Sequence, residues 1–318
     1  MKKALGLIGK IAIFVLCGLL ALIVLLVGVL NLAKFAIYGE YYSIKENICK
    51  NPGLSDGFVC QGIAACEDDS VFLVSGYMKD GSASRIYVTT LENKVHYISL
   101  ESGKEAFCGH AGGVAVSRGI VYLADGGRVY TLLLSDLLRA DNGSTVEIGA
   151  GIAVNNNADF IYTDDKFIYV GEFHDGDAYV IEGHENKTAE GEHHAICSKY
   201  EIGKLGSPVA VYSIRNNVQG ICFTPEGKVV MSTSYGLLSS RFYVYDVKEA
   251  TDAGITMDGA PVYYLDKLQR EIKGPAMSEG LDVYNGKVIT LFESASNKYI
   301  FGKFFFANKI VALDLEKN

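Results

Sequence analysis

The chain has 318 residues, of which 49% are hydrophobic and 21% are charged, and its formal net charge is −8. This composition is typical of a folded globular domain and excludes a disordered chain. Residues 1–41 hold four lysines and one glutamate, so the remainder carries a net charge of −11. An acidic domain disfavours nucleic acid and anionic lipid as partners, because both require a positive surface.

The first predicted element is an apolar helix. Residues 11–33 contain no charged side chain, and Asn31 is the one strongly polar residue among them. At about 1.5 Å per residue, this run is long enough to cross a hydrocarbon layer of about 30 Å. It is also longer than the apolar part of a cleaved signal peptide. The run predicts an uncleaved signal anchor in residues 1–41, followed by one domain in residues 42–318.

Charge on either side of the apolar run predicts its orientation. Lys2, Lys3 and Lys10 precede the run, whereas Lys34 is followed by Glu40. An excess of lysine on a short flank keeps that flank in the cytoplasm. We therefore expect a single-pass protein of the cell membrane, held in the membrane by residues 11–33, with a cytoplasmic N-terminus and an extracytoplasmic C-terminal domain.

A short pattern of β-branched and aromatic residues recurs five times after the helix. The copies are residues 84–88, 127–131, 176–180, 240–244 and 308–312. Repeated sheet units cannot bury their apolar faces alone, so they stack around an axis. The repeat predicts an all-β, five-bladed β-propeller, in which each copy is the third strand of a blade.

The other strands of each blade can be aligned with these copies. First strands are predicted at residues 61–64, 112–115, 158–161, 219–222 and 279–282, mostly after a polar residue and a glycine. Second strands begin at Val71, Val121, Ile168, Val229 and Val288. Weaker fourth strands are predicted at residues 95–100, 145–154, 195–202 and 261–265. The fifth blade lacks a fourth strand, and we expect residues 42–49 to fill that place and close the ring.

On these recurring strands, residues 42–318 resemble the β-propeller superfamily in general. The sequence has no WD dipeptide signature, no kelch signature and no recurrent Asp box, so it matches no specific propeller family. Propellers include enzymes, binding platforms and scaffolds. The resemblance therefore implies a fold and leaves the activity to be argued from a site.

Polar residues at one face of the predicted propeller form the candidate site. In each blade, the first and third strands start at this face and the second strand ends there, around the axis. The candidate ligand-binding residues are Gln61, Arg85, His110, Asp125, Glu172, His174, Gln219, Arg241 and Glu279. Polar groups that converge on a concave mouth are typical of a binding site. The repeated Tyr87, Tyr130, Tyr179 and Tyr243 are interpreted as packing between blades.

Two functions fit this arrangement. The first is a membrane-anchored propeller that binds a small ligand or an envelope protein at the axial rim. The alternative is a hydrolase of a glycan or phosphoester, in which Glu172, His174 and Glu279 act in acid–base chemistry or hold a metal. No catalytic residue is assigned. The sequence predicts no cofactor. The alternative is that the protein binds a divalent cation such as calcium.

Six cysteines follow the apolar run, and an oxidising compartment would permit up to three disulfides among them. We expect Cys49 to pair with Cys60, because the short loop between them would join the stem to the first blade. Cys66 and Cys222 lie inside strand patterns and are interpreted as buried thiols. No CxxC pair is present, so the sequence predicts no zinc site.

Overall fold

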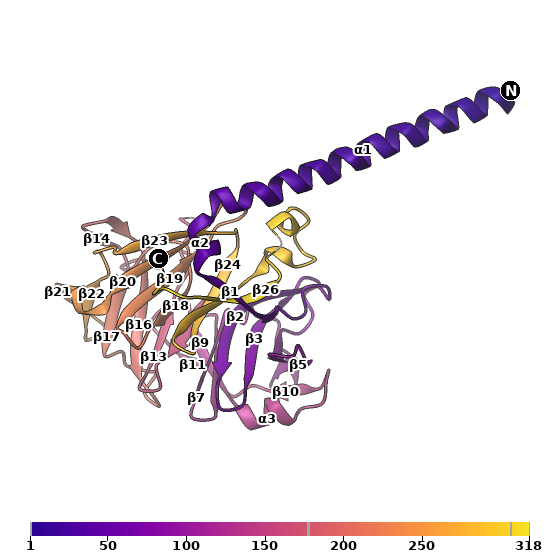
Figure 1. Ribbon diagram of the computed structural model, residues 1–318. Coiled ribbons are helices and arrows are strands. Elements are labelled where there is room, and N and C mark those ends of the chain that lie inside the picture. The colour runs from indigo at the N-terminus through magenta and orange to yellow at the C-terminus, as the bar shows by residue number, and fades with distance from the viewer. Residues whose placement is uncertain (1, 177–178, 306, 318) are drawn as a thin grey trace.

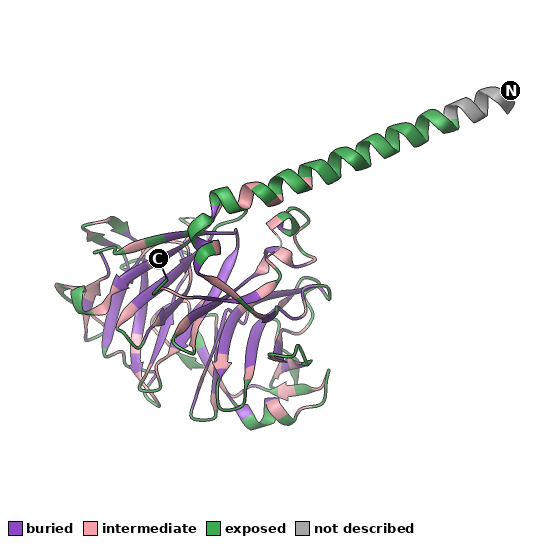
Figure 2. Ribbon diagram, in the orientation of Figure 1, coloured by how far each residue is buried: buried purple, intermediate pink, exposed green. Residues whose placement is uncertain are grey.

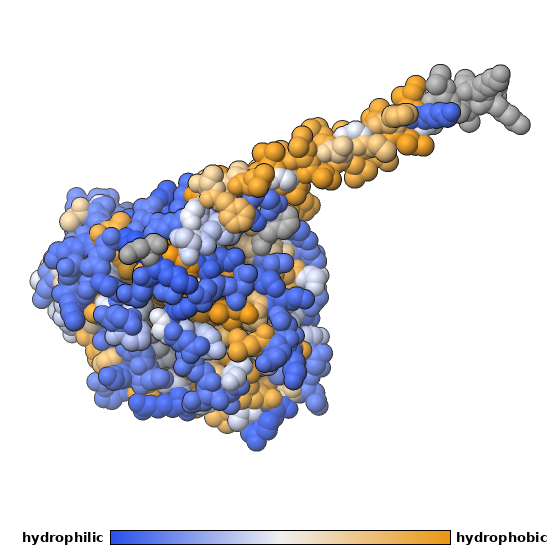
Figure 3. All heavy atoms as spheres, viewed as in Figure 1, coloured by the Kyte–Doolittle hydropathy of each residue, from blue (hydrophilic) through white to orange (hydrophobic). Residues whose placement is uncertain are grey.

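The computed structural model describes residues 2–176, 179–305 and 307–317, with side chains from residue 9 onward. A five-bladed β-propeller follows one long helix, α1 (Lys2–Ile37), as predicted (Figure 1). The stretch Gly9–Ile37 is long and apolar enough to cross a membrane, and none of its side chains is buried. Figure 3 shows α1 as a hydrophobic rod that leaves a largely hydrophilic domain.

Blades 1 and 2 are sheets with their first strands at the axis. Blade 1 consists of β2 (Phe58–Cys66), β3 (Val71–Met78), β4 (Arg85–Thr90) and β5 (Val95–Ser102), with β6 (Glu105–Ala106) and β10 (Thr145–Glu147) at its outer edge. Blade 2 consists of β7 (Gly113–Ser117), β8 (Ile120–Asp125), β9 (Arg128–Leu133) and β11 (Ile152–Ala153), and α3 (Leu134–Arg139) follows β9.

Blades 3, 4 and 5 are built in the same way. Blade 3 consists of β12 (Phe160–Thr163), β13 (Phe167–Gly171), β16 (Ala195–Glu201) and β17 (Ala210–Ile214), extended outward by β22 (Ala260–Tyr264) and β21 (Thr251–Met257). Blade 4 consists of β18 (Val218–Phe223), β19 (Lys228–Thr233), β20 (Ser240–Asp246) and β23 (Arg270–Gly274), with η1 (Val247–Glu249) after β20. Blade 5 consists of β24 (Ser278–Tyr284), β25 (Lys287–Phe292), β26 (Lys309–Leu313) and β1 (Lys45–Lys50), and η2 (Glu293–Ala295) and η3 (Phe301–Phe305) connect β25 to β26.

The ring closes through strands from both ends of the chain. β1 pairs antiparallel with β26, with Lys45 opposite Leu313 and Lys50 opposite Lys309. In Figure 1 the two strands lie side by side although they are far apart in sequence. The predicted closure is therefore confirmed, except that residues 42–44 end the short helix α2 (Gly39–Ile44) instead of starting the strand.

The predicted third strand of blade 3, at residues 176–180, is wrong, and residues 177 and 178 lie outside the described residues. The strand that pairs with β13 is β16, which covers the segment predicted as the fourth strand. Between β13 and β16, the described residues 173–176 and 179–194 form an insertion with the hairpin β14 (Asn186–Thr188) and β15 (Gly191–His193). Burial explains the difference, because β16 buries Ile196 and Cys197 completely whereas Tyr179 and Val180 are exposed.

Two predicted fourth strands also belong elsewhere. The segment predicted at residues 261–265 corresponds to β22, which pairs in parallel with β17 of blade 3, and β23 completes blade 4. The segment predicted at residues 145–154 divides between β10, which joins blade 1, and β11, which pairs with β9. Strands at the outer edge are not constrained by the axis, so they pair with whichever free edge they reach.

The first strands pack closely around the axis. Contacts run from β2 to β7, β12, β18, β24 and back to β2, and the strands are largely buried (Figure 2). A Cβ atom on Gly62 would lie 2.5 Å from the backbone nitrogen of Val114, and one on Gly220 would lie 2.8 Å from that of Leu281. The glycine that follows the polar residue at the start of these strands is therefore required by the approach of the neighbouring blade.

The expected Cys49–Cys60 disulfide is wrong, because all seven cysteines are free thiols in this structure. The Sγ atom of Cys60 instead accepts a hydrogen bond from Asn51 Nδ2 at 3.1 Å. Cys66 and Cys222 are buried, as predicted. Burial raises the pKa of the Cys66 thiol to about 12, so this thiol is a packing group.

Replacement of Gly62 by alanine tests this packing. The added methyl group meets the backbone of β7, which cannot move aside, so we expect Gly62→Ala to lower the free energy of unfolding by at least about 2 kcal/mol. Gly206→Ala is the matched control, because a Cβ atom added to Gly206 would have no other atom within 4 Å. Urea unfolding of the two variants measures the difference, and equal stability would contradict the packing argument.

Candidate functional site

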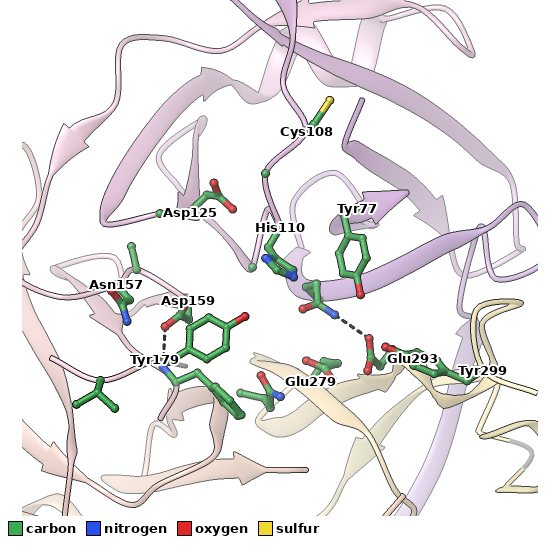
Figure 4. Close-up of a pocket in the computed structure, with 18 residues that line it drawn as sticks. Tyr77, Cys108, His110, Asp125, Asn157, Asp159, Tyr179, Glu279, Glu293 and Tyr299 are labelled. Carbon is green, nitrogen blue, oxygen red and sulfur yellow. Dashed lines mark hydrogen bonds between the residues drawn. The ribbon is translucent and has the colours of Figure 1, made fainter. Parts of the chain in front are cut away.

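The axial face of the propeller contains a cavity of about 520 Å³. Its wall comes from the starts of the first strands, the ends of the second strands and the connections that follow them (Figure 4). The polar lining residues are Gln61, Tyr77, Cys108, His110, Asp125, Asn157, Asp159, Tyr179, Gln219, Glu279, Glu293 and Tyr299. Four of them are carboxylic acids, and they come from blades 2, 3 and 5.

Glu279 and Glu293 form the most deeply buried acidic pair of the cavity. Glu279 is 2% exposed, and burial together with the negative charge of Glu293 raises its pKa well above the usual range. Burial raises the pKa of Glu293 to about 7, against the opposing effects of Tyr299, Lys298 and Gln61. Gln61 Nε2 donates a hydrogen bond to Glu293 Oε2 at 3.0 Å. Near neutral pH, the two carboxyls therefore carry fewer than two negative charges between them, because the pair is partly protonated.

Asp159 and Asp125 line the opposite part of the cavity. Burial raises the pKa of Asp159 to about 7, and the neighbouring Glu172 and Asp125 add to this shift. The backbone N–H of Phe173 donates to Asp159 Oδ2 at 2.7 Å and opposes the shift. Burial also raises the pKa of Asp125, whose Oδ1 accepts a hydrogen bond from the Ala111 N–H at 2.9 Å. None of these four carboxyls forms an ion pair with the described residues.

Aromatic rings complete the wall. His110 meets the edge of Tyr77 with ring centres 4.8 Å apart, and Phe173 meets Tyr179 at 5.5 Å. The ammonium group of Lys298 lies 4.7 Å from the ring centre of Tyr77 and hydrogen-bonds its hydroxyl. The cavity thus combines carboxyl, amide and phenol groups with ring faces that an apolar part of a ligand can contact.

Five of the nine predicted site residues line this cavity, and they are Gln61, His110, Asp125, Gln219 and Glu279. The other four do not. Arg85 stacks on Tyr97, with its guanidinium carbon 4.1 Å from the ring centre. Arg241 forms an ion pair with Glu271 at the edge of blade 4.

Glu172 and His174 are buried behind the cavity wall, inside blade 3. Glu172 Oε1 lies 2.7 Å from His184 Nδ1 and accepts a hydrogen bond from the Ile196 N–H at 3.0 Å. The ring of His174 stacks on His194, with centres 5.1 Å apart. The triplet of Glu172, His174 and Glu279 that the sequence suggested for a hydrolase is therefore divided between the blade interior and the cavity.

Several lining residues were missed by the sequence reasoning. Tyr179 was interpreted as packing between blades, but it lies in the insertion of blade 3, is 36% exposed and lines the cavity. Tyr299 and Asn157 lie in connections that the strand alignment did not cover. Their position depends on where the connections fold back over the axis, and the local sequence carries no periodic signal for that.

Among the described residues, no group of three or more His, Cys, Asp or Glu side chains is arranged to hold a metal ion. The cavity acids come from three blades: Asp125 from blade 2, Asp159 from blade 3, and the pair Glu279 and Glu293 from blade 5 (Figure 4). The possible calcium site suggested by the carboxylates therefore has no ligand set in the described part of the chain.

The raised pKa of Asp159 predicts a pH-dependent stability. The carboxyl of Asp159 releases its proton near pH 4 in the unfolded chain, whereas the native chain keeps this proton up to about pH 7. The contribution of Asp159 to the stability of the native state is therefore present at low pH and is lost as pH rises to about 7. We expect Asp159→Asn to be more stable than the wild type at pH 8, by up to about 4 kcal/mol, and similar to it at pH 4. Denaturant unfolding at both pH values measures this, with the exposed Asp141→Asn as control. A variant that gains nothing at pH 8 would contradict the buried-acid assignment.

No family model and no curated protein matches this chain. Solved structures match it over the propeller. The PQQ-bound aldose sugar dehydrogenase from Streptomyces coelicolor is 15% identical over 78% of this chain and 76% of its own, with a TM-score of 0.43. An exo-β-1,3-galactanase from Phanerochaete chrysosporium in complex with galactose is 11% identical over 78% and 60%, with a TM-score of 0.44. The hydrazine synthase of Kuenenia stuttgartiensis is 12% identical over 74% and 55%, with a TM-score of 0.39, so this chain spans little more than half of that protein.

Proposed function

We propose that this chain is a membrane-anchored propeller that binds a small, non-anionic ligand rich in hydrogen-bond donors in the axial cavity. The observation that carries the proposal is the gathering of Asp125, Asp159, Glu279 and Glu293 around one cavity. Buried carboxyls without a cationic partner cost stability. A ligand whose ammonium or hydroxyl groups bind these oxygens would recover part of that cost.

The lining of the cavity supports this class of ligand. The residues that line the cavity include no lysine or arginine, and the Lys298 ammonium group beside the wall is engaged by the ring and hydroxyl of Tyr77. A phosphate or carboxylate group would therefore meet four carboxyls and little positive charge. Gln61, Gln219 and Asn157 add amide groups, which donate and accept hydrogen bonds. Saccharides and amino sugars present the matching set of hydroxyl and ammonium groups. A phosphoester substrate is disfavoured on the same grounds.

Ligand binding can be tested with full-length protein in detergent by calorimetric titration. We expect neutral saccharides or amino sugars to bind and the corresponding sugar phosphates not to bind. Glu293→Gln should weaken binding at least about tenfold, because a charge-assisted acceptor is lost, without lowering the melting temperature. Glu226→Gln, at an exposed turn between β18 and β19, is the control. Preferential binding of the phosphates, or wild-type affinity in Glu293→Gln, would overturn the proposal.

A hydrolase remains the second candidate, and the pair Glu279–Glu293 favours it. Two adjacent carboxyls whose pKa values are pushed upward to different extents are the arrangement from which acid and base roles arise. In the same titrations, a glycosidic ligand that is cleaved over time by the wild type and not by Glu279→Gln would select this candidate. Stable binding without cleavage would select the binding protein.

The proposed topology places the propeller outside the cytoplasm, because lysines flank the apolar run on its N-terminal side. We expect protease added to intact cells to digest the domain, leaving the membrane-embedded fragment. A cytoplasmic protein that resists digestion until the cells are lysed is the control. A domain that is digested only after lysis would reverse the orientation.

A further inference from the structure

The connection between β25 and β26 exposes apolar side chains. Ile300 is 78% exposed and Phe301 is 66% exposed, and with Leu238 at 69% they are the most exposed large hydrophobic residues of the described propeller. Phe304 of η3 is 37% exposed. Single exposed hydrophobic residues are ordinary, but three on one short segment indicate a surface that contacts an apolar phase.

The same segment lies beside the membrane helix. η3 contacts α1. The partly covered residues of α1 lie near its C-terminal end and are Val27, Asn31, Ala33 and Lys34, while the rest of the stretch from residue 9 to residue 37 is exposed. Val27, Asn31 and Lys34 form one stripe, and part of their cover comes from the hydrogen bonds of Asn31 to Val27 O and of Lys34 to Asn31. These residues are spaced as one helix face, and Val27 and Asn31 belong to the apolar run. When α1 crosses a bilayer, η3 is therefore level with the outer part of the crossing segment.

The charges of the segment suit the surface of a bilayer. Lys298 and Lys303 are exposed and lie on either side of Ile300 and Phe301 in the sequence, and their ammonium groups also hydrogen-bond Tyr77 and Asn297. Aromatic and aliphatic side chains with adjacent lysines are typical of segments that lie in the membrane interface, where the apolar groups enter the acyl region and the ammonium groups meet phosphates. The partner that fits this surface is therefore lipid. The remainder of the domain is acidic and does not offer such a surface.

The segment is also part of the cavity wall. Glu293 begins it and Tyr299 precedes Ile300, and both line the cavity. The ammonium group of Lys298 lies between them in sequence and is 5.2 Å from the ring centre of Tyr299. Tyr299 and Ile300 are adjacent in the chain. If Ile300 lies in the membrane interface, Tyr299 and the part of the cavity wall that it forms therefore lie at the membrane surface.

We propose that residues 298–305 insert into the outer leaflet of the bilayer that α1 crosses, and that the axial cavity therefore opens beside the membrane surface. This inference rests on the proposed function in one respect, since it requires α1 to span the membrane. A ligand would then reach the cavity along the lipid surface, which suits the head group of a glycolipid or a saccharide tethered to the membrane.

A fluorescence quenching experiment with full-length protein in phosphatidylcholine vesicles tests this inference. Three variants each carry one reactive thiol for a fluorophore, with Cys17 and Cys108 replaced by serine where they are not the labelled site. The labelled sites are the native Cys17 in α1, Ile300→Cys in the segment and Asp68→Cys at a turn on the opposite face of the propeller. The remaining five cysteines are buried. The quencher is brominated phosphatidylcholine.

We expect strong quenching at Cys17, and quenching at Ile300→Cys at least about threefold stronger than at Asp68→Cys. The added changes Phe301→Asp and Phe304→Asp should reduce quenching at Ile300→Cys to the level of the control, because they remove the apolar groups that enter the leaflet. Quenching at Cys17 without excess quenching at Ile300→Cys would overturn the docking and leave the anchor intact. Absence of quenching at Cys17 would remove the anchor, and the docking with it.

Discussion

The pairing of β1 with β26 is the constraint on which the rest of the molecule depends. A propeller is stable only as a closed ring, because an open blade exposes a sheet edge and the apolar face of its neighbour. Here only the short helix α2 separates the closing strand β1 from the long apolar helix α1, so the same pairing that completes the ring also joins α1 to the domain. Glu46 of β1 adds ion pairs to this strand pairing, with Lys287 at 2.7 Å and with Lys317. The hydrogen bonds from these two lysines lower the pKa of Glu46 to about 2. Arg270 of blade 4 pairs with Glu40 of α2 at 2.7 Å and holds the stem.

Closure also determines where a ligand site can form. Five first strands must meet at the axis, and their glycines show how little space separates them. Above this contact, Gln61, Gln219 and Glu279, which precede the glycines of blades 1, 4 and 5, line the mouth of the ring. Any propeller built in this way has an axial depression, so its chemistry depends on which side chains occupy those few positions.

Much of this could be predicted from the sequence, because the residues near the axis repeat. The first and second strands follow the predicted order in all five blades, and five of the nine predicted site residues line the cavity. The error at β16 arose because a short Tyr-Val pattern in an insertion resembled the motif, whereas burial selected the longer apolar strand. Arg85 and Arg241 were misplaced for a geometric reason: third strands stand two strands away from the axis, so residues at their starts reach neighbouring side chains and not the central mouth.

The distribution of side chains around the axis is uneven, and this unevenness shapes the cavity. Blades 1, 4 and 5 place the long polar side chains Gln61, Gln219 and Glu279 before their glycines, whereas blades 2 and 3 place Gly112 and Ala158 at the corresponding positions. The small residues leave room on that side. In blade 3 the next position, which is glycine in the other four blades, is Asp159, whose carboxyl lines the cavity. A ring that needed only to be filled would carry apolar side chains at such positions, since apolar groups avoid the desolvation of a carboxyl. The acids are placed where the packing leaves space, so the centre of the ring is a cavity lined by carboxyls and not a core filled by apolar side chains.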